Sequence, residues 1–195
     1  MEQELQKSIE FLKETDKMKA IYRQNTLLDR SRREDDAAHS WHCAVMAMTL
    51  APYAKPEVDI DRAVQMLLMH DLVEIYAGDT PCYDVDVVAT QEAREAAAAQ
   101  KLLDVMPAAL ADTYKTLWAE FSQNCTPTAQ YAVTVDRLQP LFLNYFTDGA
   151  SWESRTVTRA QVLKRNAIAK ETLPALYPTI LKAIDTLTEK GLLEP

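Results

Sequence analysis

The chain has 195 residues, 48% of them hydrophobic, which fits a single domain, 1–195, with a substantial buried core. Its 21 Lys and Arg residues against 29 Asp and Glu residues give a net charge of −8, which argues against nucleic acid or an anionic membrane as a partner. Three widely spaced cysteines without a C-x-x-C pair give no sign of a disulfide framework or a zinc knuckle. With no long apolar run and no signal peptide, the sequence predicts a soluble, cytoplasmic protein.

Apolar residues recur at spacings of three and four along the first half of the chain, which is the period of amphipathic helices. After a first helix, a charged segment at 29–36 is a loop candidate, and Gly78 interrupts the pattern further on. The pattern predicts three helices in this half: 3–22, 37–53 and 60–76.

The second half carries several helix start signals. An alanine-rich run over 92–103 has high helix propensity, and Pro107 is expected at the first position of the next helix. Thr126 precedes a second such proline, and Thr158 with Gln161 is spaced as a capping box. With the first half, these signals predict an all-α fold of seven or eight helices.

Polar side chains interrupt an apolar helical stretch, LLMHDLVEIYAGDTP. His70, Asp71 and Glu74 are three or four residues apart or adjacent, so they can share one helix face or its margin. Buried acids need partners or a metal, although an isolated His-Asp pair is more often a hydrogen-bonded pair of the core. A functional site is favoured because all three histidines lie in or near the second and third helices, and because Asp79 follows in the sequence G-D-T-P.

His39 upstream and Asp136 downstream complete a set of two imidazoles and two carboxylates with His70 and Asp71. Such a mixed nitrogen and oxygen site suits one divalent ion of Mn, Fe, Co or Zn. His42 lies three residues from His39 and is expected to be a neighbouring hydrogen-bond partner rather than a ligand.

Asp136 lies in the apolar run AVTVDRLQP. Because Pro140 has no amide hydrogen, it cannot bond the carbonyl of residue 136, so a kink is predicted beside this acid. The alternative role for Asp136 is a structural ion pair with Arg137 or another arginine.

The order H, HD, D in a helical protein resembles the HD-domain superfamily of metal-dependent phosphohydrolases. His39, His70, Asp71 and Asp136 match the four metal ligands of that superfamily. The longer pattern HDxxExxxGDxP looks like the 5′-deoxynucleotidase branch, whose members remove phosphate from deoxynucleoside monophosphates. The resemblance spans residues 23–166.

The resemblance also implies roles for three further residues. Glu74 would place the metal-bound water, Asp79 would act in proton transfer, and Arg23, near the end of the first helix, would contact the phosphate. The alternatives are a hydrogen-bond acceptor for Glu74, a turn cap for Asp79 and an interaction with the helix dipole for Arg23. One departure from the family pattern is Ala38, because relatives usually carry glutamate directly before the first histidine.

The expected function is therefore the metal-dependent hydrolysis of a small phosphomonoester, foremost a (deoxy)nucleoside 5′-monophosphate. Two alternatives remain: a di-iron oxygenase, for which His42 is the only spare histidine, and a non-catalytic protein that binds metal or nucleotide. The partners implied are a phosphorylated small molecule and, by analogy, a second copy of the chain in a homodimer, with the helix at 92–103 as one candidate surface.

Overall fold

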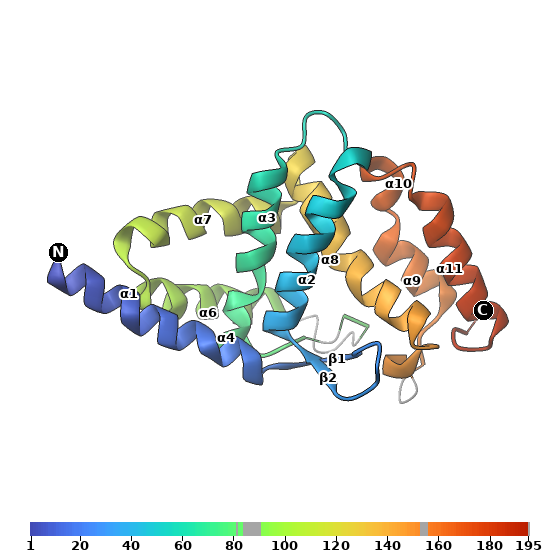
Figure 1. Cartoon of the computed structure of the whole chain (residues 1–195), viewed down its shortest axis with the longest axis horizontal. Helices are drawn as coiled ribbons and strands as arrows, with labels where there is room; N and C mark the ends of the chain where they lie inside the picture. Colours follow the sequence, from blue (N-terminus) through green and yellow to red (C-terminus); the bar gives the residue numbers. More distant parts are fainter. Residues whose placement is uncertain (81, 84–90, 153–155, 195) are drawn as a thin grey trace.

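Helices α2, α3 and α8 form the centre of the protein (Figure 1). The structure is a computed structural model, and it describes residues 1–80, 82–83, 91–152 and 156–194. The central helices pack against one another, and their bounds are Asp36–Leu50, Ile60–Met69 and Pro127–Phe146. Their contact surfaces build the main hydrophobic cluster, which includes Cys43, Leu67, Val135 and Leu138.

Side-chain caps fix where the central helices begin. Asp35 accepts a hydrogen bond from the amide of Ala38 at 2.9 Å, and Asp59 accepts one from Arg62 at 2.9 Å. Thr126 caps α8 in the same way, with Pro127 in the first turn as the sequence predicts. A short 3-10 helix, η2 (Ala51–Tyr53), extends α2.

A second hydrophobic cluster lies on one side of the centre, where α1, α6 and α7 surround the end of α3 (Figure 1). The bounds of these three helices are Glu2–Thr15, Gln91–Val105 and Ala108–Gln123. Ala98 and Ala99 of α6 are buried in this cluster, so part of the alanine-rich surface is used within the chain itself. Pro107 is the N-cap of α7 and not, as predicted, its first residue.

The opposite side is covered by α9, α10 and α11 (Figure 1), whose bounds are Arg159–Asn166, Ala169–Thr172 and Tyr177–Glu189. The capping box predicted at Thr158 and Gln161 is confirmed, with each side chain bonded to the other residue's amide. A 3-10 helix, η4 (Ala150–Trp152), follows α8.

The all-α class is confirmed. Within the described ranges, eight α-helices have at least eight residues, and the two short strands form a single hairpin. None of the described helices combines the length and hydropathy that crossing a membrane requires.

The prediction of one helix over 3–22 is wrong in its C-terminal part. The prediction of a loop over 29–36 is also wrong in its C-terminal part, where a strand and the start of α2 replace the loop. The first segment divides into α1, a 3-10 helix η1 and strand β1, of which the last two are Asp16–Ala20 and Tyr22–Thr26. Strand β1 pairs antiparallel with β2 (Arg33–Asp35). The Arg33 guanidinium crosses the hairpin and donates to the carbonyls of Tyr22 and Arg23 at 2.9 and 2.5 Å, a tertiary contact that hydrophobic periodicity does not reveal.

The predicted third helix, 60–76, is broken at its functional end. Helix α3 ends at Met69, a 3-10 turn η3 covers His70–Val73, and α4 covers Glu74–Ala77. Leu67 before the turn belongs to the main cluster, whereas Leu72 and Val73 belong to the second. The turn therefore joins the two halves of the core, and the side chains it carries are positioned by both.

Candidate metal centre

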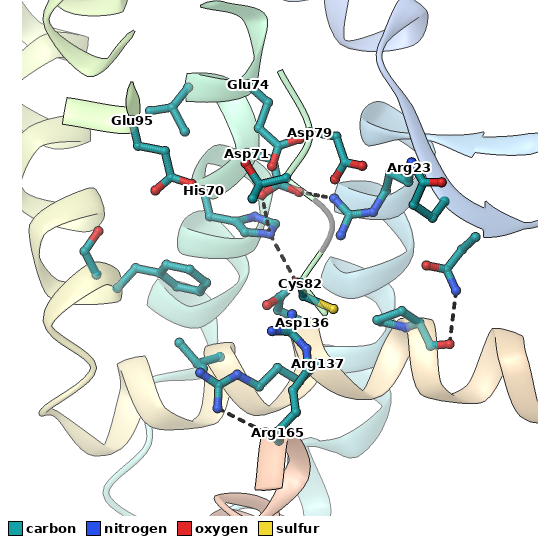
Figure 2. Close-up of a pocket in the computed structure, with 18 of the residues that line it drawn as sticks. Arg23, His70, Asp71, Glu74, Asp79, Cys82, Glu95, Asp136, Arg137 and Arg165 are labelled. Atoms are coloured by element: carbon teal, nitrogen blue, oxygen red, sulfur yellow. Dashed lines mark hydrogen bonds and ion pairs between the residues drawn. The ribbon is translucent and has the colours of Figure 1, made fainter. Parts of the chain in front are cut away.

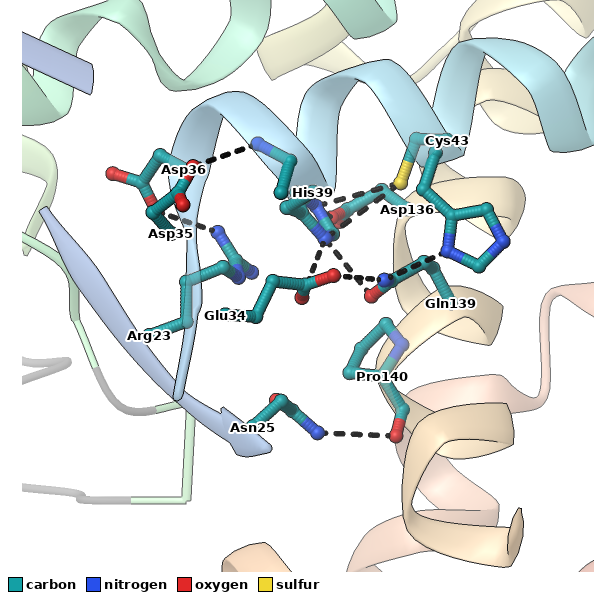
Figure 3. A network of polar contacts seen from close by, with 12 residues as sticks. Arg23, Asn25, Glu34, Asp35, Asp36, His39, Cys43, Asp136, Gln139 and Pro140 are labelled. Atoms are coloured by element: carbon teal, nitrogen blue, oxygen red, sulfur yellow. Dashed lines mark hydrogen bonds and ion pairs between the residues drawn. The ribbon is translucent and has the colours of Figure 1, made fainter. Parts of the chain in front are cut away.

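The four predicted ligands come together although they lie on three separate elements. His39 comes from α2, His70 and Asp71 from η3, and Asp136 from α8 (Figures 2 and 3). Oδ1 of Asp136 lies 3.2 Å from Nε2 of His39 and 3.5 Å from Nε2 of His70. Asp71 Oδ1 lies 3.1 Å from the same nitrogen of His70.

The backbone orients His70. Its Nδ1 lies 2.9 Å from the carbonyl oxygen of Leu67, which fixes the proton on Nδ1 and leaves Nε2 as the free lone pair. Nε2 is buried and, among the described atoms, has no hydrogen-bond partner. The ring packs against Phe121, with 5.0 Å between centroids. A buried imidazole nitrogen aimed at two carboxylates is the arrangement that a metal ligand requires.

A glutamine orients His39 (Figure 3). His39 Nδ1 lies 2.9 Å from Oε1 of Gln139, and Nε2 of Gln139 donates to Glu34 at 2.6 Å. Gln139 also lies 3.2 Å from Nδ1 of His42, so His42 contacts the glutamine and not the ligand cluster. Gln139 is fully buried and Glu34 is 2% exposed. This chain of contacts directs Nε2 of His39 toward Asp136.

Charge at the cluster fits a bound cation. Burial would raise the pKa of Asp136, but the adjacent imidazoles of His39, through a hydrogen bond, and of His70, through its charge, hold it well below its usual range. Burial would likewise lower the pKa of His70, yet Asp71 and Asp136 raise it. The four side chains thus favour positive charge between them. Two imidazole nitrogens and two carboxylates are a suitable donor set for a divalent Mn, Co, Fe or Zn ion.

Asp136 does not form the ion pair with Arg137 that was its alternative role. Within the described part of the chain, its recorded ionic contacts are with the two histidines. Helix α8 continues through Pro140, whose carbonyl accepts hydrogen bonds from the side chains of Asn25 in β1 and Asn144, at 3.2 and 3.0 Å. These bonds connect the hairpin to α8 beside the cluster.

A group of three carboxyls adjoins the cluster. Asp36, Glu74 and Asp79 have oxygens within 4.8 Å of one another. Burial, followed by the charge of Asp71, raises the pKa of Glu74 well above its usual value and that of Asp36 to about 6. Burial also raises the pKa of Asp79, against the opposing effect of Arg23. Groups with such pKa values can carry protons near neutral pH.

Arg23 lies between the two groups of acids (Figure 2). Its Nη1 is 2.8 Å from Asp71 Oδ2 and 3.3 Å from Asp36 Oδ1, and its Nε is buried without a partner among the described atoms. Burial would lower its pKa, but the charges of Asp71 and Glu74 raise it, so the guanidinium stays charged. It comes from strand β1 and not, as expected, from the end of a helix.

The cluster opens onto a pocket of about 830 Å³. Figure 2 shows Glu74 and Asp79 at the top of this pocket, Asp136 in the middle, and Arg137 and Arg165 below it. A volume of this size is typical of sites for small organic ligands.

Sequence reasoning missed Asp36, Gln139 and the positioning role of Glu34. Glu34 and Asp36 belong to the charged run R-R-E-D-D, which reads as a solvated loop, and only its place directly before His39 hints otherwise. Gln139 is three residues from Asp136, so the two share one face of α8, a spacing that could have indicated a second polar group in the core.

Comparison with known proteins gives the family. A family model for the HD domain matches residues 15–177. A solved structure, of a predicted metal-dependent phosphohydrolase from Magnetospirillum magnetotacticum, superimposes with a TM-score of 0.91 at 42% identity, covering 98% of this chain and 96% of that one. A conserved hypothetical protein from Pyrococcus furiosus shares the fold, with a TM-score of 0.62 and 24% identity over 93% of this chain and 99% of its own.

Curated relatives are more distant. The 5′-deoxynucleotidases HDDC2 of Xenopus laevis and Homo sapiens are each 24% identical over 132 residues, which is 67% of this chain. The match spans 64% and 63% of their own lengths.

The chain belongs to the HD-domain family. Its fold is that of the solved structure of a predicted metal-dependent phosphohydrolase, and His39, His70 and Asp136 offer ligand atoms within 4.8 Å of one another.

Proposed function

We propose that this protein hydrolyses a small phosphomonoester, a (deoxy)nucleoside 5′-monophosphate, with one divalent ion held by His39, His70, Asp71 and Asp136. The main support is the convergence of these four side chains, from three separate elements, beside an arginine and a group of protonatable acids. When bound, the ion would lower the pKa of a coordinated water toward neutrality and neutralise charge on the phosphoryl oxygens.

The chain's own residues supply the remaining functions. Arg23, which is held at the mouth of the cluster by Asp71, donates to the phosphoryl oxygens and stabilises the charge that develops on them. Glu74 accepts a hydrogen bond from the attacking water and aligns it with the phosphorus. Asp79, whose pKa is raised by burial, donates a proton to the leaving 5′ oxygen.

A nucleotide substrate is supported by the two curated relatives, which are 5′-deoxynucleotidases, and by a pocket far larger than a phosphate group needs. Trp152 and Tyr83 line this pocket and offer apolar surface to a base or sugar.

The oxygenase alternative finds less support. A di-iron oxygenase requires further histidine ligands for its second metal ion. The chain's third histidine, His42, contacts Gln139 instead. Carboxylates of Asp36, Glu74 and Asp79 are the groups that would have to hold a second iron.

Phosphate release from a panel of nucleoside 5′-monophosphates and simple phosphomonoesters tests the proposal, using metal-stripped protein resupplied with Mn, Co, Zn, Fe or Mg. We expect metal-dependent release that falls at least about 100-fold in Asp71→Asn and Glu74→Gln, because each loses a carboxyl group at the reacting centre. Asp112→Asn, an exposed acid of α7, is the matched control and should retain full activity. Stoichiometric metal binding without release from any substrate would leave a binding role, and oxygen consumption with two irons bound would indicate the oxygenase.

A further inference from the structure

Two arginines that line the pocket, Arg137 and Arg165, have no acidic partner among the described residues. Arg137, on α8, donates through Nη1 to the backbone carbonyl of Arg165, on α9, at 3.1 Å. Neither guanidinium lies within ion-pairing distance of a carboxylate in the described part of the chain. By contrast, Arg23, Arg62 and Arg159 each pair with an acid at 2.6 to 2.8 Å.

The proximity of Arg137 and Arg165 is electrostatically unfavourable without a bound anion. Arg137 and Arg165 are both partly buried and both line the pocket. Two like charges at a half-buried position repel each other, and the effect is larger in a partly desolvated pocket than in water. Although the chain has a net charge of −8, none of the described acids forms an ion pair with either guanidinium. An anion from outside the protein would compensate the charge of the two arginines.

Arg137 and Arg165 are also separate from Arg23, which is proposed to contact the phosphate that is hydrolysed. Arg23 lies with Asp71 and Asp79 at one part of the pocket, while Arg137 and Arg165 lie beyond Asp136 (Figure 2). Nearby, Asn166 is buried and its Oδ1 has no hydrogen-bond donor among the described atoms, so it can accept from a hydroxyl of a bound molecule.

We propose that Arg137 and Arg165 form a second anion subsite, so that the pocket selects phosphomonoesters that carry an additional phosphate or carboxylate group away from the scissile ester. This inference rests on the proposed phosphohydrolase function and narrows its substrate class. Planar guanidinium groups suit both oxyanions, because their paired N–H donors match two oxygens at once.

Matched substrate pairs test the subsite and separate the two anion types. Deoxyadenosine 3′,5′-bisphosphate is compared with deoxyadenosine 5′-monophosphate, and 6-phosphogluconate with glucose 6-phosphate. In the wild-type protein we expect the doubly anionic member of at least one pair to bind at least 10-fold more tightly. The pair that shows the preference identifies phosphate or carboxylate as the second group.

Two variants assign the preference to the arginines. Arg165→Gln removes a charge but keeps the backbone carbonyl that Arg137 bonds, so the fold should be unaffected. Arg137→Gln removes the other charge. In each variant we expect the preference to fall to less than about 3-fold through KM, with kcat on the singly anionic member unchanged. Lys164→Gln, an exposed charge of α9 directly beside Arg165, is the control and should keep the preference.

Equilibrium binding to the metal-free protein, measured by calorimetry, keeps this test independent of turnover. A preference for the bis-anions that the two variants abolish would support the subsite even if no phosphate were released, in which case the proposed function alone would fail. Equal binding of both members of each pair, or an equal loss of kcat/KM for both in the variants, would overturn the subsite, since the arginines would then serve the scissile phosphate or the fold.

Discussion

Gln139→Leu is the substitution that best tests how the metal centre is held together. Leucine has nearly the volume of glutamine, so the helix and the packing of this fully buried position are retained. The change removes the acceptor for His39 Nδ1 and the donor to Glu34, which lie at 2.9 and 2.6 Å. No atom that would touch the metal is altered.

Two effects follow, and their sizes can be worked from these contacts. An unpaired buried donor on His39 costs about 1–3 kcal/mol, and a hydrogen bond to a charged acceptor such as Glu34 is worth about 1.5–3 kcal/mol. We expect a combined loss of about 3 kcal/mol, since the two contacts share one side chain and are not additive. For a domain of this size, that lowers Tm by roughly 6–12 °C.

Metal affinity should fall as well. Without Gln139, the His39 ring can rotate or carry its proton on Nε2, the nitrogen that faces Asp136. Loss of such an orienting partner typically weakens metal binding about 10–100-fold. Calorimetric titration with Mn, Co or Zn measures the affinity, and thermal unfolding of the metal-free protein measures the stability.

Gln130→Leu is the matched control for this measurement. Gln130 is on the same helix, and among the described residues its side chain makes one long 3.5 Å bond, to the carbonyl of Asn124. It should change neither the affinity nor Tm appreciably. If Gln139→Leu lowers Tm but leaves the metal affinity within about 3-fold of the wild type, Gln139 supports the fold and does not orient His39, and the reasoning is refuted.

Three further predictions concern stability. Burial raises the pKa of Asp36 to about 6 in the folded state, above its unfolded value, so folding takes up a proton between about pH 4 and 6 and stability falls as pH rises through this window. Asp36→Asn should therefore raise the free energy of unfolding of the metal-free protein at pH 7.5 by on the order of 1 kcal/mol and have no stabilising effect at pH 4. A gain at both pH values would contradict the linkage. Tyr131→Phe removes the buried hydroxyl that donates to the carbonyl of Ala47 at 2.6 Å and should cost about 1–3 kcal/mol in urea unfolding, with an unchanged midpoint showing that water replaces the bond. Thr126→Ala removes the cap of α8, bonded to the amide of Ala129 at 3.0 Å, and should cost about 1 kcal/mol, whereas Thr126→Ser should restore most of it.

Hydrophobic period and capping residues were enough to predict most helices and the all-α class, because these signals act within a few residues of one another. The capping box at Thr158 is an example, since both partners lie in one turn. The break of the third helix at His70 was not predictable in this way. It depends on Leu72 and Val73 packing into a cluster formed with α1, α6 and α7, which are distant in the sequence.

The residues of the candidate site also differ in whether the sequence alone could predict them. His39, His70, Asp71 and Asp136 were predicted because histidine and aspartate in apolar runs are costly without a purpose, and because their order matches the metal ligands of HD-domain proteins. Asp36 and Gln139 were missed because one stands in a charged run and the other resembles any buried glutamine until its contacts with His39 and Glu34 are seen. Their importance comes from three-dimensional neighbours, which one sequence without its fold does not contain.

The separation of the ligands along the chain also bears on how the protein matures. His39 and Asp136 are 97 residues apart, and the turn that carries His70 is held by both hydrophobic clusters. During synthesis, the first three ligands leave the ribosome well before Asp136 does, so the nascent chain lacks one carboxylate of the set until α8 has emerged. With the proposed set of four ligands, metal loading would be a late event that stabilises only the finished bundle, and the cellular concentration of free metal would then shift the balance between folded and unfolded chains.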